Sequence, residues 1–86
     1  MAALNVFVVS AERELWSGEA TQVVARTTEG EIGILAGHEP ILAVLAPGES
    51  RVTTADGQTI TARVEDGFLS VQGDTVSIVA GNAELV

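Results

Sequence analysis

Glycine is spread at short intervals along this chain of 86 residues, and this spacing constrains the fold more than any other feature. The nine glycines are scattered, and the rest of the chain is rich in Val, Thr and Ile. Branching at Cβ restricts χ1 and suits a pleated strand, whereas Gly marks turns between strands. No segment has a clear 3.6-residue apolar period. The sequence therefore predicts many short strands and an all-β fold.

The apolar runs between turn signals define the expected strands. The first covers 4–9, with Leu4, Val6 and Val8 on one face. The others cover 13–17, 21–27, 31–35, 41–45, 49–54, 58–64, 68–71 and 75–79. A turn or bulge is expected at Ser17-Gly18, and turns at Pro47-Gly48, Asp56-Gly57 (type I′), Asp66-Gly67 and Gly73-Asp74. About eight to ten short strands in one small domain, residues 1–86, bury their apolar faces as a two-sheet β-sandwich or flattened barrel.

Composition excludes several function classes. Four Arg and no Lys stand against 12 acids, which gives a net charge of −8. This balance argues strongly against nucleic-acid binding and would repel an anionic membrane surface. No Cys means no disulfide framework, thiol nucleophile or thiolate metal site. The sequence therefore predicts membrane association only through protein partners.

Targeting signals are missing from the sequence. The N-terminus, Met1-Ala2-Ala3-Leu4-Asn5, has no basic n-region before an apolar core. The longest apolar run, 41–46, is far shorter than a membrane span. We therefore expect the protein to remain in the cytosol.

The segment 29–40 holds the most distinctive candidate chemistry. Its three glycines invite a phosphate-loop interpretation, but no Lys and no Ser or Thr follows Gly37 as that site needs. Gly30, Gly33 and Gly37 are expected at bends and close approaches instead. The acidic cluster of Glu29, Glu31 and Glu39 lacks the calcium-loop pattern. It is expected to be a solvated loop or a docking site for a basic partner.

The single histidine and the single tryptophan have structural explanations. His38 is expected to be a structural or interface residue, since one His without Cys is too few for a typical zinc site. A catalytic triad assembled in space stays open, with Ser10, Ser17, Ser50, Ser70 or Ser77 as its nucleophile. Trp16 is expected to anchor the core or a sheet edge. The residues alone favour a sandwich that works by contact, with no catalytic residue, metal site or cofactor predicted.

An ordered set of motifs resembles the N-terminal β-sandwich domain of the epsilon subunit of bacterial rotary ATP synthases. These motifs are LNVFVVSAE at 4–12, LWSGEA at 15–20, TEGEIGILAGHEP at 28–40, APG at 46–48 and DGFLSV at 66–71. The match runs over essentially the whole chain. The Trp16 variant and the abundance of Ala and Val are similar to actinobacterial members.

The resemblance implies a ten-stranded sandwich and a non-catalytic role in the central stalk. It implies a peripheral place at the cytoplasmic face of the bacterial plasma membrane, where the rotor couples proton transport to ATP synthesis. By resemblance, Thr28, Glu29, Gly30 and Glu31 contact the c ring, with Glu31 as the main ionic contact. Ser10, His38 and Ala43 are expected toward the gamma subunit.

The chain also departs from the family pattern. Ala36 stands where members often have Pro, so the loop before His38 is expected to be less rigid. Nothing helical is expected after Gly81, so the family's C-terminal inhibitory hairpin and its ATP site are expected to be absent. Bare sheet edges leave self-association of the isolated domain open. The alternatives are a free-standing ligand- or metal-binding sandwich and, third, an enzyme that depends on His38.

Overall fold

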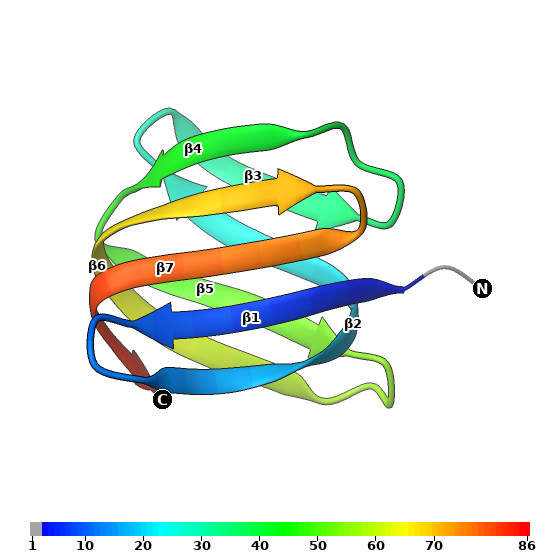
Figure 1. The fold of residues 1–86 in the computed structure, drawn as a ribbon, viewed down its shortest axis with the longest axis horizontal. Helices are drawn as coiled ribbons and strands as arrows, with labels where there is room; N and C mark the ends of the chain where they lie inside the picture. The colour runs from blue at the N-terminus through cyan, green and yellow to red at the C-terminus, as the bar shows by residue number, and fades with distance from the viewer. Residues whose placement is uncertain (1–2) are drawn as a thin grey trace.

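The computed structural model describes residues 3–86, which form an all-β domain with no helix in that range (Figure 1). Seven strands follow in order along these residues: β1 (Leu4–Ser10), β2 (Glu14–Thr27), β3 (Gly30–Leu35), β4 (Ile41–Leu45), β5 (Gly48–Thr54), β6 (Thr59–Gln72) and β7 (Thr75–Leu85). Residues 1 and 2 of the predicted domain lie outside the described range. The all-β sandwich predicted from the sequence is confirmed.

The strands form one hydrogen-bonded sheet that folds over on itself into two layers. The first layer holds the start of β2, then β1, the start of β7, the end of β6, and β4. The second holds the end of β7, the start of β6, then β5, the end of β2, and β3. The pair of β1 and β7 is parallel, and the remaining strand pairs are antiparallel.

Three long strands, β2, β6 and β7, pass from one layer into the other. The first half of β2 pairs with β1, and its second half pairs with β3 and β5. In the same way β6 pairs first with β5 and then with β4, while β7 pairs with β1 only in its first half. If each long strand is counted as two segments, the seven strands of residues 3–86 agree with the ten expected.

The expected break at Ser17-Gly18 is wrong, because β2 continues through it. A Cβ on Gly18 would lie 2.9 Å from Cζ2 of Trp16, so this glycine leaves room for the indole ring. Trp16 is half-buried and packs against the core, as the sequence predicted. Gly18 therefore serves side-chain packing, and the irregularities in β2 lie on either side of it, between Glu14 and Trp16 against β1 and between Ala20 and Gln22 against β5.

The expected turn at Asp66-Gly67 is also wrong, since β6 runs through both residues without reversing. Asp66 has a φ of 56°, a left-handed conformation that Asp tolerates. A Cβ on Gly67 would lie 2.0 Å from the carbonyl oxygen of Val79 and 2.6 Å from Cα of Ala80. The glycine thus permits a close approach of two backbones where β6 bends between layers.

Two of the expected hairpins are present. Gly73-Asp74 joins β6 to β7, and the positive φ of 62° at Gly73 alone fits a type II′ turn. At Asp56-Gly57 the type I′ prediction is wrong, because only Gly57 has a positive φ, of 91°. The N–H of Gly57 donates to the carbonyl of Thr54, and the N–H of Thr54 donates to that of Gln58. This is a three-residue loop with a type I turn and a left-handed glycine.

The core lies between the two layers and is built from aliphatic side chains. Leu4, Val6 and Val8 of β1 are fully buried, as their alternation predicted. The other buried hydrophobic residues are Ala20, Val23, Ala25, Ile34, Leu45, Val52, Ala62, Val64, Leu69, Val71, Val76, Ile78 and Ala80. Both layers are thereby covered on their inner side, which leaves two outer sheet faces for contacts with other molecules.

Candidate interaction surfaces

The β2–β3 hairpin carries Thr28, Glu29, Gly30 and Glu31 and lies at one end of the sandwich (Figure 1). Its base is fixed from within, because the Thr27 hydroxyl donates to the carbonyl of Gly30 over 2.7 Å and accepts from the N–H of Glu29. Its tip is fixed from outside, because the N–H of Thr28 donates to the carbonyl of Val44 over 3.0 Å. The hairpin is therefore held against the end of β4.

The two carboxylates of this hairpin have different surroundings. Glu31 lies on β3 directly opposite Arg26 of β2, and its Oε2 is 3.9 Å from Nη2 of Arg51. Glu29 is exposed at the tip, and no ion pair reaches it within residues 3–86. The Glu29 carboxylate therefore has no cationic side chain paired with it in residues 3–86, whereas the Glu31 carboxylate is paired with Arg51.

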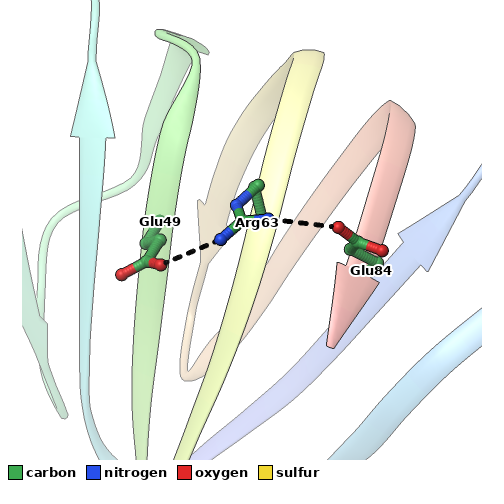
Figure 2. Close-up of polar contacts among 3 residues, drawn as sticks. All are labelled: Glu49, Arg63 and Glu84. Atoms are coloured by element: carbon green, nitrogen blue, oxygen red, sulfur yellow. Dashed lines mark hydrogen bonds and ion pairs between the residues drawn. The ribbon is translucent and has the colours of Figure 1, made fainter. Parts of the chain in front are cut away.

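The outer surface of the second layer is a charged face, defined by Arg26, Glu31, Glu49, Arg51, Arg63 and Glu84. Figure 2 shows its central contact, in which Arg63 of β6 lies between Glu49 of β5 and Glu84 of β7. The nitrogen-to-oxygen distances are 3.7 Å to Glu49 and 3.3 Å to Glu84. Opposite charges in register across strands stabilise the sheet modestly. Two of the three arginines of this face are therefore paired with its three glutamates.

The outer surface of the first layer is an apolar face, defined by Phe7, Val9, Leu42, Val44, Phe68 and Val79. Strand register places Val9, Val79, Phe68 and Val44 in one row across four strands, and Phe7 and Leu42 at the two ends of the next. Leu42 is 72% exposed, Val44 61% and Phe68 44%. A contiguous apolar group on an outer sheet face marks an interaction surface.

His38 lies in the loop between β3 and β4, at the end of the sandwich opposite the β2–β3 hairpin. Its N–H donates to the carbonyl of Leu35 over 3.1 Å, which closes a β-turn. Gly37 is the third residue of that turn and has a φ of 85°, which identifies type II. The ring Nδ1 lies 2.7 Å from the carbonyl oxygen of Glu39. Within residues 3–86 no serine hydroxyl bonds to the ring.

Ser10 and Ala43 lie at different positions around the apolar face. Ser10 ends β1, and its hydroxyl accepts from the N–H groups of Glu12 and Arg13, each over 3.2 Å. Ala43 lies in the middle of β4, but it pairs with the fully buried Leu69, so its side chain points toward the core. Its neighbours Leu42 and Val44 are the exposed residues. Asn5, near the start of β1, lies at the end of the sandwich that holds the His38 loop. The strand from Asn5 to Ser10 is about 17 Å long, so Ser10 and His38 lie at opposite ends of the sandwich.

Other kinds of site find little support in residues 3–86. No group of three or more His, Asp or Glu side chains is placed to hold a metal ion in that range. Within the same range no helix has the length and apolar character that a membrane crossing requires. A shallow groove of about 410 Å³ lies between the start of β2 and the end of β7. The contact surfaces are therefore the most developed features of the molecule.

Sequence reasoning missed both outer faces as units. It placed Leu4, Val6 and Val8 on one face of the first strand, but it did not connect the opposite face of that strand to Leu42, Val44 or Phe68. The signal was present in 41–45, where an unbroken apolar run is typical of a strand covered on both sides. Only the register of β4 with β6, β7 and β1 shows that these residues share one surface.

Comparison with known proteins is consistent over nearly the whole chain. A family model described as "ATP synthase, Delta/Epsilon chain, beta-sandwich domain" matches residues 3–86. The ATP synthase epsilon chain of Micrococcus luteus is 58% identical over 85 residues, which cover 99% of this chain and 93% of that protein. The ATP synthase epsilon chain of Rhodococcus opacus is 55% identical over 86 residues, covering 99% and 70%.

A solved structure shows the same fold within a larger chain. A chain in the structure of the Euglena gracilis mitochondrial ATP synthase, OSCP/F1/c-ring, superposes with a TM-score of 0.91 and 29% identity. The superposition covers 99% of this chain and 54% of that chain, so the protein spans about half the length of its Euglena counterpart.

Proposed function

The chain belongs to the ATP synthase delta/epsilon chain family and is of the epsilon type, and we propose that it works as a non-catalytic subunit of the central stalk. In this role residues 1–86 form one epsilon-type β-sandwich domain that binds the gamma subunit and the c ring. It couples proton transport to ATP synthesis at the cytoplasmic face of the plasma membrane. The observation that carries the proposal is the apolar face. Two of its strands, β1 and β4, carry Ser10 and Ala43, which the family resemblance places toward gamma.

The apolar face supports the gamma contact by its position and chemistry. His38 lies at one end of the face, in the β3–β4 loop, and Ser10 lies at the other end, where β1 stops. Ala43 lies within β4, between the exposed side chains of Leu42 and Val44. Burying one leucine or phenylalanine side chain contributes about 1.5–3 kcal/mol. Interfaces concentrate their energy in such central apolar residues. Leu42 and Phe68 are therefore the proposed anchors on gamma, with Ser10 and His38 at the rim.

A matched pair of variants tests the gamma contact. The double variant Leu42→Ser with Phe68→Ser removes two anchors from the apolar face. The control Leu85→Ser removes an exposed leucine (44%) from the end of β7, in the layer of the charged face. Binding to purified gamma is measured by calorimetry. We expect the double variant to lose about 10- to 100-fold in affinity and the control to match the unmodified chain. Equal losses in both would reject the apolar face as the gamma site.

The β2–β3 hairpin is proposed as the c-ring contact, through Thr28, Glu29, Gly30 and Glu31. Its two internal hydrogen bonds and its link to β4 hold the tip in a fixed position. The ring is expected to present a basic residue, and an exposed carboxylate guides encounter and orientation with such a partner. Since Arg26 and Arg51 already lie beside Glu31, we assign the larger share of the contact to Glu29.

Charge reversals at matched positions test the ring contact. Glu29→Lys is compared with Glu31→Lys and with Glu19→Lys, which makes the same charge change at an exposed glutamate of β2, ten residues before the hairpin tip. The measurement is ATP-driven proton pumping by the complex reconstituted with each variant. We expect the order of loss to be Glu29→Lys, then Glu31→Lys, with Glu19→Lys unaffected. Full pumping by Glu29→Lys would exclude the hairpin tip as an ionic contact.

A further inference from the structure

The tip of the β6–β7 hairpin holds the His38 turn from outside. The backbone N–H of Gly37 donates to Oδ1 of Asp74 over 3.0 Å, a contact between residues 37 positions apart. The carbonyl of the same Asp74 accepts from the N–H of Asn5 over 2.7 Å. One residue thus connects three segments: the β3–β4 loop through its side chain, the start of β1 through its backbone, and the hairpin that it belongs to.

The turn itself lacks the residue that most favours its conformation. In the type II turn from Leu35 to His38, Ala36 occupies the second position, where Pro presets φ near −65°. Alanine leaves that torsion free in the unfolded chain. The turn is closed by only one backbone hydrogen bond of its own, from His38 to Leu35. The contact from Asp74 adds a second hydrogen bond that restrains the turn from outside.

We propose that Asp74 is a positioning residue for gamma binding: its carboxylate fixes the Gly37–His38 turn at the edge of the apolar face. A carboxylate that accepts a backbone N–H makes a stronger hydrogen bond than a neutral acceptor does. The contact acts through the turn, and Asp74 itself need not contact the partner. This inference rests on the proposed gamma contact of His38 and adds the residue that keeps His38 in place.

The first test needs no partner and measures hydrogen exchange at the Gly37 amide in the free chain. Asp74→Ala removes the acceptor, and we expect Gly37 exchange to become at least fivefold faster. Asp74→Asn keeps an acceptor oxygen and is expected to retain most of the protection. The control Asp56→Ala alters the tip of the β5–β6 hairpin, where the side chain bonds only within its own loop. Unchanged Gly37 exchange in Asp74→Ala would overturn the proposal.

The second test measures gamma affinity and uses proline as a rescue. Asp74→Ala is expected to weaken binding about fivefold, and Asp56→Ala to leave it unchanged. Adding Ala36→Pro should restore affinity in the Asp74→Ala background, because the ring presets the same turn. Residue 36 holds the second position of the type II turn, where proline is favoured. Leu35 before it is in an extended strand, as a residue preceding proline prefers.

The outcomes separate this inference from the proposed function. If the unmodified chain does not bind gamma, the proposed function and the inference both fail. If it binds and Asp74→Ala binds equally well, only the positioning role of Asp74 is overturned. If Asp74→Ala weakens binding and proline fails to restore it, the loss does not arise from the turn, and the inference is likewise rejected.

Discussion

The two outer faces of the sandwich share two long strands, β6 and β7, but differ in how their side chains are satisfied. On the charged face, Arg63 lies between two glutamates and Arg51 lies beside a third, so opposite charges meet within the domain. On the apolar face, Leu42, Val44 and Phe68 project from neighbouring strands into solvent. The charged face thus pairs most of its charges within the domain, whereas the apolar face leaves apolar surface exposed to water.

The difference separates the source of binding affinity, which is apolar surface, from the source of orientation, which is fixed charge. Removing apolar area from water supplies affinity without regard to direction. Exposed ion pairs contribute little to stability, but fixed charges at an edge guide the approach of a partner. The proposed function uses both, because in it the domain holds gamma through apolar contact and meets the c ring through a charged tip.

Gly67→Ala tests the bend in β6. At this bend the strand passes from the second layer, which carries the charged face, into the first layer, which carries the apolar face. The new Cβ would overlap the backbone of Val79 and Ala80, so β6 and β7 must separate. We expect the free energy of unfolding to fall by about 3 kcal/mol or more, measured by urea denaturation. Gly33→Ala is the control, because its Cβ would meet nothing closer than 3.9 Å. Equal stability of the two variants would show that the bend needs no close approach.

Hydrophobic-dye binding tests whether the apolar face is accessible in the free domain. The variant Leu42→Ser with Phe68→Ser is expected to reduce dye fluorescence by about half or more, because it removes two large exposed side chains from one patch. The unfolding free energy should fall by about 1–2 kcal/mol, since Leu42 is largely exposed whereas Phe68 is more than half buried. Leu35→Ser, an isolated exposed leucine, should leave the signal nearly unchanged. Identical signals from all three chains would contradict the contrast between the faces.

Arg63→Met tests the charged face at its centre. The substitution removes both ion pairs while keeping most of the apolar stem of the side chain. Because these groups are about half exposed, we expect a loss of under about 1 kcal/mol in unfolding free energy. The loss should shrink further in 1 M salt, where exposed charges are screened. A larger loss, or one that salt does not reduce, would show that this face contributes more than balanced charge.

Asp56 offers the smallest effect and lies on neither face. A hydrogen bond from Thr54 lowers the pKa of the Asp56 carboxyl below its ordinary value of 3.8. A carboxyl with a depressed folded-state pKa stabilises the fold above its unfolded value, and this contribution is lost as pH falls through the folded value. Removing the donor with Thr54→Val should therefore make stability less dependent on pH below about 4. Thermal unfolding across pH 2–6 checks this, and unchanged pH dependence would refute it.

Much of the fold could be predicted from the pattern of residues. Strand alternation identified the buried face of β1, and the runs at 31–35, 41–45 and 49–54 correspond to β3, β4 and β5. The errors fall on glycine. At Gly18 and Gly67 the sequence signalled a break or a turn, yet both lie inside long strands. Glycine permits a reversal and a close approach equally well, and only the partner strand decides between them.

The candidate sites divide in the same way. The hairpin with Glu29 and Glu31 is local in sequence, so its residues could be grouped without a structure. Arg51 lies 20 positions from Glu31, and nothing in the sequence indicates that their charges meet. Asp74 is likewise distant from Gly37. Contacts of this kind depend on strand register, which short-range patterns do not determine.

The three strands that belong to both layers also have a mechanical consequence. Because β2, β6 and β7 each continue from one layer into the other, sliding the layers past one another would strain continuous covalent chain. The hairpin that ends in Glu29 is the extension of one of these strands and is hydrogen-bonded to β4 as well. A force applied at that tip is therefore transmitted along the continuous backbone of β2 into the first layer. The shared strands thus favour transmission of torque through the domain over deformation of the domain itself.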